Sequence, residues 1–422
     1  MLFVRYRVTC AIYWIAQDVP ITAAKGLRAT RSCGNARFPV QSATMAPANT
    51  ARQMPDGTDQ RTAVTGFATG EGTRRFAARS APRFAEDFYR ELGPEILVSS
   101  IGMGTYLGAC DDEDDTRYVA ILSEGLARGV NVLDTGINYR CQRSERAVGR
   151  AIHRAIDAGT VSRDEIVVCT KGGYVPLEGA PPRSRQEYRA YLANEYFDPG
   201  VMSAGDVVAG HCLKPRFLAN QIARSRANLG VGGIDVFYLH NPEQQLDFLG
   251  PAEFLNVIRA AFTELETQVQ AEAISVYGCA TWNGFRVFAA NRSHLSVAGL
   301  MRIAHEVGGA NHHFRVLQMP VNLAMTEAVR APTQQHDGKN MSALELAAQL
   351  GVAVVASASL MQSQLASGLP AEVRAAFPAL ATDAQRAIAF VRSLPVSTAL
   401  VGMKTQAHLD ENLAAARPIT RS

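Results

Sequence analysis

The sequence predicts an α/β protein built as a closed (β/α)8 barrel, the TIM-barrel class, with an extended loop after the third strand and a loose N-terminal arm. Two observations predict this class: eight short apolar runs lie between residues 96 and 417, and a segment with helical punctuation follows each run. Eight such units fit one barrel better than two domains, and a doubly wound open sheet is the structural alternative. We expect residues 91–422 to form the single barrel domain and residues 1–90 to be a poorly ordered extension.

The expected strands are short apolar runs bounded by turn-forming residues. In chain order they are Ile96–Gly104, Val130–Thr135, Glu165–Lys171, Ile234–His240, Ala273–Ala280, Phe314–Val321, Val352–Leu360 and Val396–Gly402.

The helices between them carry recognisable signals. Apolar residues from Ala147 to Ile156 recur at helical spacing and form one stripe, with arginines on the opposite face. Capping boxes open two further helices, SALE from Ser342 and TDAQ from Thr382. Pro215 stands where a first-turn proline is expected for another helix.

The charge balance separates the first fifty residues from the rest. Residues 1–50 hold six of the 42 basic residues and one of the 39 acidic residues, which leaves 36 basic against 38 acidic. This balance predicts no partnership with nucleic acid or with an acidic membrane surface. The seven cysteines are odd in number and form no C-x-x-C pair, which favours a reducing compartment, and we expect a cytoplasmic protein.

The N-terminal leader has three interpretations. Its apolar run VTCAIYWIA, from Val8, has nine residues and is too short to span a bilayer. With Arg5 and Arg7 before it, the run is typical of a weak signal peptide, and an Arg-rich, acid-poor leader also suits an organelle transit sequence. We favour an over-long start with Met45 as the true one.

The connection after the third strand is unusually long. More than forty residues separate Lys171 from Pro215, whereas such loops usually have about 2–6 residues. Long loops are often lids or binding loops, and residues 174–214 leave the strand end beside the polar residues described next. A lid and an insertion without function both remain open.

Polar side chains stand at the ends of the second, third and fourth strands. The second ends in LDTGINY with Asp134 and Tyr139, the third in VCTK with Lys171, and the fourth in YLHNP with His240. In a TIM barrel these ends meet at the C-terminal mouth, where such enzymes carry out their chemistry. We therefore expect the four side chains to lie together.

Each of the four also has an ordinary structural explanation. Asp134 suits a turn, Tyr139 a packing position, Lys171 a solvated strand end and His240 a satisfied core site. A carboxylate, a phenol, an ammonium and an imidazole at consecutive strand ends are much less expected by chance than any one of them.

Together the four suit the delivery of a proton to a carbonyl oxygen. The Lys171 ammonium stabilises a phenolate, so we expect it to lower the pKa of Tyr139 from its usual value of about 10 and to make the phenol a usable acid. Asp134 would pair with Lys171, and His240 would donate a second hydrogen bond to the same oxygen. The hydride must come from a cofactor, because side chains cannot supply one.

With further motifs, these residues resemble the aldo-keto reductase superfamily over residues 96–417. In order, the motifs are GMGTY, DT…Y…SE, TK, LHNP, YGCATW, LQMPVN, VVASASL and VGMKTQAHLDENLAA. The resemblance implies a catalytic quartet of Asp134, Tyr139, Lys171 and His240, with Tyr139 as the proton donor. Tyr139 and His240 would contact the substrate, and Trp282 is a further candidate for substrate contact because it follows the fifth strand, with packing at the mouth as the alternative.

The same resemblance implies a nicotinamide cofactor, NADP(H) in preference to NAD(H), bound across the barrel mouth without a Rossmann domain. The glycines of GMGTYLG indeed lack the G-x-G-x-x-G spacing. The implied cofactor contacts are Gly104, Thr105, Tyr106, Asp134, Thr281, Gln318, Ser357, Leu360, Lys404, His408, Glu411 and Asn412.

Three features depart from the family pattern. Ala280–Thr281 stands where the family often has serine and asparagine for the carboxamide, and His408 stands where NADP-preferring members often have arginine. NYRCQRSE, from Asn138, has two extra residues before SE. The change at His408 bears on the choice between NADP and NAD.

We expect an enzyme, an aldo-keto reductase-like and NAD(P)H-dependent oxidoreductase acting on a small carbonyl or alcohol. The alternatives are a sugar or alcohol dehydrogenase working in the oxidative direction, a regulatory cofactor-binding barrel with vestigial catalysis, and a barrel lyase or isomerase that needs no nicotinamide.

We expect no metal, because the pairs His211–Cys212 and His312–His313 lack ligand spacing and are interpreted as polar loop residues. The acidic run at 110–115 is interpreted as a solvated helix start.

Overall fold

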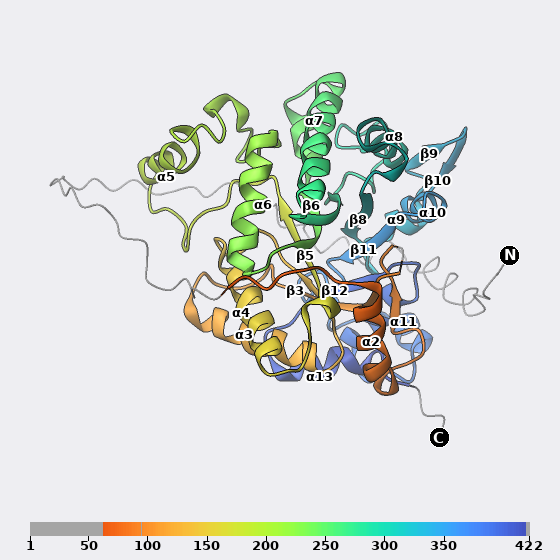
Figure 1. Cartoon of the computed structure of the whole chain (residues 1–422). Coiled ribbons are helices and arrows are strands. Elements are labelled where there is room, and N and C mark those ends of the chain that lie inside the picture. The colour runs from red at the N-terminus through yellow and green to blue at the C-terminus, as the bar shows by residue number, and fades with distance from the viewer. Residues whose placement is uncertain (1–61, 94, 419–422) are drawn as a thin grey trace.

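The computed structural model describes residues 62–93 and 95–418. A closed barrel of eight parallel strands forms its centre (Figure 1), which confirms the predicted fold class. Around the barrel the strands follow the order β11-β12-β3-β4-β5-β6-β7-β8, and each predicted run supplies one of them. Their bounds are β3 Ile101–Gly104, β4 Val132–Asp134, β5 Val167–Gly172, β6 Ile234–His240, β7 Ile274–Ala280, β8 Phe314–Pro320, β11 Ala353–Ser357 and β12 Thr398–Gly402.

The runs are almost continuously apolar because both faces of each strand are covered. In β6 all seven residues are buried, as expected for a parallel strand between a barrel interior and a helical layer. Val236 and Tyr238 belong to the cluster that fills the barrel. Phe237 and Leu239 belong to the larger core outside it.

Helices surround the barrel, and their starts follow the sequence signals. The principal ones are α3 Asp112–Ala127, α4 Arg143–Asp157, α6 Pro215–Leu229, α7 Pro251–Gln270, α8 Val297–Gly308, α10 Ala343–Gln349, α12 Asp383–Arg392 and α13 Gln406–Ala414. Both predicted capping boxes are present, at Ser342 and Thr382, and Pro215 occupies the first turn of α6. The acidic run opens α3, with Asp111 as the N-cap, as predicted. It is not solvated throughout, because Asp114 and Asp115 are buried and pair with Lys404 and Arg140.

Several shorter elements lie between the principal helices and strands. They are α9 Glu327–Arg330, α11 Ala371–Ala376, the antiparallel hairpin of β9 Gln334–His336 and β10 Lys339–Met341, and the short turns η3 Arg163–Glu165, η6 Pro242–Asp247 and η7 Gly309–Asn311. No helix in the described ranges is both long enough and apolar enough to cross a membrane.

The first predicted strand is in fact divided in two. Its beginning, β2 (Leu97–Ser99), pairs antiparallel with β1 (Tyr89–Glu91), and only Ile101–Gly104 enters the barrel. The Asn131 side chain causes the change of direction, because it accepts from the Ser99 N–H at 2.8 Å and donates to the Leu97 carbonyl at 2.9 Å. Val98 and Leu92 join the apolar cluster inside the barrel, so the hairpin closes its lower end.

The predicted loose arm differs from the structure over its last part. Residues Gly70–Ser80 form helix α2, followed by the turn η2 (Ala81–Arg83), and α2 is held against η3. Arg79 and Arg75 pair with the buried Glu165 at 2.5 and 3.0 Å. These contacts join residues that are distant in the sequence, so no local pattern predicted the helix. The leader and Met45 lie outside the described residues.

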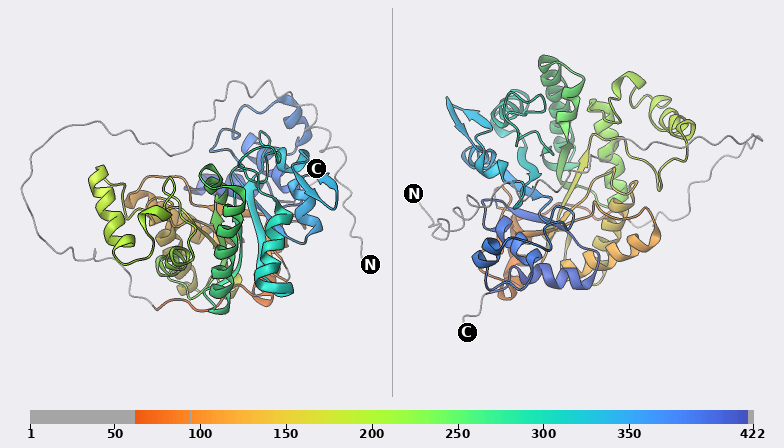
Figure 2. Two further views of the ribbon diagram at one scale, coloured as in Figure 1. Left: turned by 90° about the horizontal axis from the view of Figure 1, so that it is seen from above. Right: turned by 180° about the vertical axis from the view of Figure 1, so that it is seen from behind.

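The long connection after β5 forms a small unit beside α6 (Figures 1 and 2). It contains α5 (Arg185–Leu192), the π-helical turn η4 (Ala193–Phe197) and the turn η5 (Ala204–Asp206). Its own apolar cluster consists of Val175, Leu192, Tyr196, Met202, Cys212 and Phe217 of α6. The segment is therefore packed through a core of its own.

One glycine of the barrel has no room for a side chain. The register of β7 against β8 shifts between Tyr277 and Gly278, and a Cβ on Gly278 would lie 1.7 Å from the carbonyl oxygen of Val316.

We predict that Gly278→Ala lowers the free energy of unfolding by about 3 kcal/mol, because backbone must move to relieve the clash. Urea unfolding checks this, with Gly402→Ala as the control, since its Cβ would come no closer than 3.8 Å to its neighbours. Equal midpoints for the two variants would contradict the prediction.

Candidate active site

Strand alternation explains why polar side chains from several strands meet inside the mouth. Val132 of β4, Val167 and Cys169 of β5, Val236 of β6 and Val316 of β8 all point into the barrel. Side chains two residues apart share a face. The next inward positions at the C-terminal ends of these strands are therefore Asp134, Lys171, His240 and Gln318.

Asp134 and Lys171 form a buried ion pair at the floor of this mouth. Lys171 Nζ lies 2.5 Å from Asp134 Oδ1 and donates to the Thr135 carbonyl at 2.6 Å. Lys171 is 1% exposed. The second carboxylate oxygen of Asp134 accepts from Gln318 Nε2 at 2.8 Å across the barrel. Both oxygens of the carboxylate are thus occupied, and its position is fixed from two sides.

Tyr139 and His240 lie together above this pair. Lys171 Nζ is 4.9 Å from the centre of the Tyr139 ring. The Tyr139 and His240 rings are 5.7 Å apart with 74° between their planes. Tyr106 packs edge-on against the other side of Tyr139 at 5.1 Å. The structure therefore brings together all four residues that the sequence singled out.

The pKa of Tyr139 does not move as the sequence suggested. Burial raises the pKa of Tyr139, and the Lys171 charge opposes this rise without reversing it. Burial also acts to lower the pKa of Lys171, but the Asp134 charge and then the interaction with the Tyr139 oxygen outweigh it, and the net shift is upward. At neutral pH the phenol therefore keeps its proton and the ammonium keeps its charge.

His240 is a neutral imidazole in this setting. Burial and then the Lys171 charge hold its pKa well below the usual value. In the described part of the chain, its Nδ1 is buried without a hydrogen-bond partner. A buried polar atom without a partner is uncommon and points to a partner that arrives with a ligand.

His211 also belongs to this site, although its sequence context predicted a polar loop residue. The ring is fully buried, and its Nε2 lies 2.7 Å from the His240 carbonyl oxygen, to which it must donate. Its Nδ1 accepts from Gln245 Nε2 at 2.8 Å. Tyr174 stacks edge-on against both histidines, at 5.0 and 4.8 Å. No local signal marked His211, because it reaches this place only when the long connection folds back onto β5.

Two residues of the SE motif also hold the site. Ser144 Oγ donates to the carbonyl of Thr105 at 2.8 Å. The buried Glu145 accepts from Thr170 Oγ1 at 2.6 Å, next to Lys171. The motif therefore ties the start of α4 to the ends of β3 and β5.

The turn between Tyr139 and α4 holds an unusual backbone. Arg140, Cys141 and Gln142 have φ values of 48°, 55° and 71°, the left-handed region that non-glycine residues rarely adopt. Arg140 offsets this strain, since its guanidinium pairs with Asp115 at 2.6 Å and donates to the Ala109 carbonyl at 2.6 Å. The two extra residues noted in NYRCQRSE fall within this turn.

The mouth-side residues implied for a cofactor line the ends of β3, β7 and β8. Thr105, which follows Gly104, is buried and bonded to the Asp134 carbonyl, whereas Tyr106 is 47% exposed. Thr281 Oγ1 is buried and has no partner in the described part of the chain. Glu243 shapes the loop that follows, because its Oε1 accepts the N–H groups of Trp282, Asn283 and Gly284. Trp282 itself remains largely exposed.

The remaining implied contacts lie at the ends of β11 and β12. Ser357 and Leu360 are half-buried, His408 is exposed on the first turn of α13, Glu411 is half-buried and Asn412 is buried. Lys404 is engaged, with its Nζ 3.1 Å from Asp114 Oδ2 at the start of α3. A phosphate held by Lys404 would therefore compete with this carboxylate.

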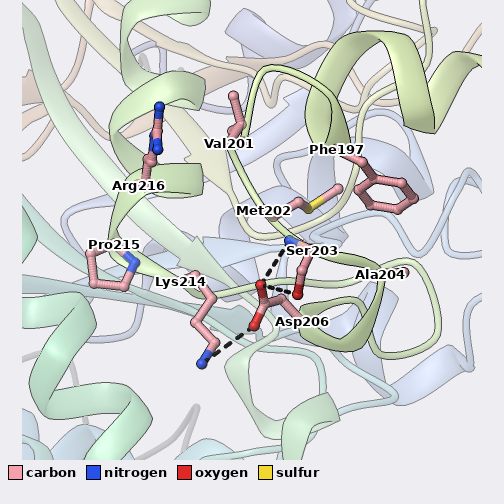
Figure 3. Close-up of a pocket in the computed structure, with 10 residues that line it drawn as sticks. Phe197, Val201, Met202, Ser203, Ala204, Asp206, Lys214, Pro215 and Arg216 are labelled. Atoms are coloured by element: carbon pink, nitrogen blue, oxygen red, sulfur yellow. Dashed lines mark hydrogen bonds and ion pairs between the residues drawn. The ribbon is translucent and has the colours of Figure 1, made fainter.

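A separate cavity of about 740 Å³ lies away from these residues, between the long connection and the start of α6. Figure 3 shows its lining, in which Asp206 bonds both Ser203 and Lys214. The catalytic candidates take no part in it. Within the described ranges, no group of three or more histidine, cysteine, aspartate or glutamate side chains is placed to hold a metal ion.

The chain belongs to the aldo/keto reductase family, whose sequence model matches residues 100–368. The family makes it an oxidoreductase by class. No curated protein matches the chain in sequence.

Solved structures with a similar fold are aldo-keto reductases. One from Klebsiella pneumoniae, crystallised with NADP and acetate, has 19% identity and a TM-score of 0.52 over 79% of this chain and 92% of that chain. A thermostable aldo-keto reductase in complex with the inhibitor epalrestat has 17% identity and a TM-score of 0.51 over 78% and 93%. One from Bacillus halodurans, in its holo form, has 18% identity and a TM-score of 0.50 over 79% and 92%. At these identities the likeness concerns the fold.

The buried His211 predicts a specific dependence of stability on pH. Burial lowers the pKa of His211 to about 4, despite its bond to the His240 carbonyl, whereas an unfolded histidine titrates near pH 6.5. As the pH falls, the unfolded chain takes up the proton before the folded chain does. The stability that neutral His211 contributes is therefore fully present above pH 6.5 and is lost as the pH falls toward 4. The loss between pH 7 and pH 5 amounts to about 2 kcal/mol.

Urea unfolding of the native protein and of His211→Gln at both pH values checks this, since the difference between the two proteins cancels the groups that titrate alike in both. An equal loss of stability in both proteins would contradict the assignment.

Proposed function

We propose that the protein is an NAD(P)H-dependent oxidoreductase that reduces a carbonyl group, with Tyr139 as the proton donor. The buried pair of Asp134 and Lys171 beneath Tyr139, with His240 facing the same ring, carries this proposal. We also propose that residues 91–422 act as one catalytic domain, because every residue invoked here lies within it.

Each member of the quartet has a separate task. Tyr139 gives its proton to the carbonyl oxygen, and the Lys171 ammonium stabilises the phenolate that remains. Neutral His240 presents a second N–H to the same oxygen, so charge developing there meets fixed donors. Asp134 keeps Lys171 in place, since an ammonium this deeply buried needs a counter-charge.

A bound nicotinamide would supply the hydride, and the residues at the mouth fit such a group. The Thr281 hydroxyl, which has no hydrogen-bond partner among the described residues, lies at the end of β7, and the Gln318 side chain is fixed by Asp134 at the end of β8. Similar aldo-keto reductases were crystallised with NADP and with NADPH. We propose NADP(H) in preference to NAD(H), with Lys404 exchanging Asp114 for a phosphate.

The exposed aromatic residues suit a small organic substrate. Tyr106 and Trp282 are 47% and 46% exposed, and Tyr174 lies against His240. We propose a small aldehyde, ketone or alcohol as the substrate, because aromatic walls bind apolar surface while the quartet orients the one polar oxygen.

Titration with NADPH and NADH tests the cofactor, with tryptophan fluorescence as the readout. Trp282 follows Thr281 directly, so a bound nicotinamide should quench its fluorescence. We expect quenching by NADPH at lower concentrations than by NADH, because NADPH carries the additional phosphate proposed for Lys404. Trp282→Phe should remove most of the signal. Binding of neither dinucleotide would contradict the proposed function, whereas binding without turnover would favour a regulatory barrel.

Replacement of the proton donor gives the test of mechanism. We predict that Tyr139→Phe leaves the affinity for the reduced cofactor within about two-fold and lowers kcat for carbonyl reduction by roughly 100-fold or more, the usual contribution of a general acid. Oxidation of the reduced nicotinamide with a panel of small aldehydes and ketones measures this.

Tyr188→Phe is the matched control, because Tyr188 lies on α5 in the apolar cluster of the long connection. Full turnover by Tyr139→Phe would mean that the proton comes from another group. The reverse assay, with oxidised cofactor and alcohols or sugars, identifies the preferred direction.

A further inference from the structure

Two cysteines from different segments meet at the edge of the barrel mouth. The Sγ atoms of Cys110 and Cys141 are 3.6 Å apart, although the residues are 31 positions apart in the sequence. Cys110 lies on the loop after β3, four residues beyond Tyr106. Cys141 lies on the turn after β4, two residues beyond Tyr139. The sulfur contact therefore joins the segments that carry the two aromatic rings of the mouth.

The two thiols differ in their access to solvent. Cys110 is half-buried at the end of an exposed loop, residues 106–109, whereas Cys141 is 6% exposed. Burial raises the pKa of Cys141 to about 12, so this thiol stays protonated at neutral pH. A reagent from solution therefore reacts with Cys110 first, because Cys141 is shielded from solvent.

Arg140 keeps the two sulfurs together. Its guanidinium donates to the carbonyl of Ala109 at 2.6 Å and to that of Asp111 at 3.2 Å, on either side of Cys110. The backbone of Cys141 is held from the other side, because its carbonyl accepts from the Gly179 N–H at 3.0 Å. The pairing is therefore built into the turn and does not depend on a chance approach of two loops.

We propose that Cys110 and Cys141 form a reversible disulfide, a covalent modification site at the barrel mouth that a hydroperoxide oxidises. The Cys110 sulfur attacks the peroxide O–O bond, which breaks and leaves a sulfenic acid on Cys110 and one water or alcohol. The Cys141 sulfur then displaces the hydroxyl group, which leaves as water with the Cys141 proton. The protein loses two hydrogens in total, and a dithiol reductant restores both.

Bond formation requires the sulfurs to approach by about 1.5 Å, since an S–S bond is about 2.05 Å long. The exposed loop of Cys110 makes this movement more readily than the buried turn of Cys141. The bond would fix the loop that carries Tyr106 to the turn that carries Tyr139. The disulfide goes beyond the proposed function and does not depend on it. Only an effect of the disulfide on cofactor binding through Tyr106 would depend on the proposed function.

The test uses the full chain, reduced and then exposed to hydrogen peroxide before the remaining thiols are blocked. Peptide mass spectrometry should find the peptides of Cys110 and Cys141 cross-linked with the loss of two hydrogens, and dithiothreitol should separate them. Cys110→Ser should abolish the cross-link, and the double variant Cys10→Ser, Cys33→Ser should keep it. The oxidised protein should also melt at a higher temperature than the reduced protein, with no such difference in Cys110→Ser, because a cross-link restricts the unfolded chain.

Two results would overturn the proposal: thiols that both survive excess peroxide, or a Cys110 that passes to sulfinic acid while Cys141 stays free. Cys110→Ser is the primary variant, because Cys110 lies near the surface and its replacement disturbs no core. The readout is a mass and a melting temperature, so it stands apart from the proposed function. A protein that binds no dinucleotide but forms this cross-link would refute the reductase proposal and leave the disulfide intact.

Discussion

The ion pair of Lys171 and Asp134 is the constraint on which the mouth of the barrel depends. An ammonium buried to this degree is tolerated only with a close counter-charge and further acceptors, and it has both, in Asp134 Oδ1 and the Thr135 carbonyl. The other carboxylate oxygen takes the Gln318 amide, and the Asp134 carbonyl takes the Thr105 N–H. One residue thus links the ends of β3, β4, β5 and β8, so the charge that we propose for the chemistry also fixes four strand ends.

This arrangement bears on how the lysine would contribute to the proposed proton transfer. A lysine that simply lowered the pKa of Tyr139 would leave part of the phenol ionised and unable to donate. Here burial keeps the pKa of Tyr139 raised, so the proton is present throughout the neutral range. In the proposed mechanism the Lys171 charge would matter most when the proton leaves, and it would stabilise the transition state more than the resting state.

The sequence was sufficient for the barrel and for the quartet because both follow from local patterns. Each barrel strand is a short apolar run, and the residue that ends it on the inward face is fixed by alternation. What the sequence could not supply depends on contacts between distant residues. Helix α2 is held by Glu165, about 90 positions away. The first strand is divided because the Asn131 side chain replaces backbone partners.

His211 and Lys404 show the same limit within the site. His211 contacts His240 only because the long connection returns and His211 forms an antiparallel bridge with Tyr174. A local sequence pattern does not predict such a return. Lys404 was expected to be available for a phosphate, but the chain places Asp114 beside it. In both cases the partner of the side chain lies far away in the sequence, at His240 and at Asp114.

The two sides of the mouth are therefore supported by different means. Tyr139 stands on a strained turn that Arg140 secures to the loop after β3. His240 is secured from behind by His211 and Tyr174, which belong to the long connection. A surface insertion without function is not expected to place a fully buried, neutral imidazole against the backbone of His240. The contacts therefore support a role for this connection in fixing His240 opposite Tyr139. A substrate oxygen between the two rings would meet two donors whose separation is set before the substrate binds.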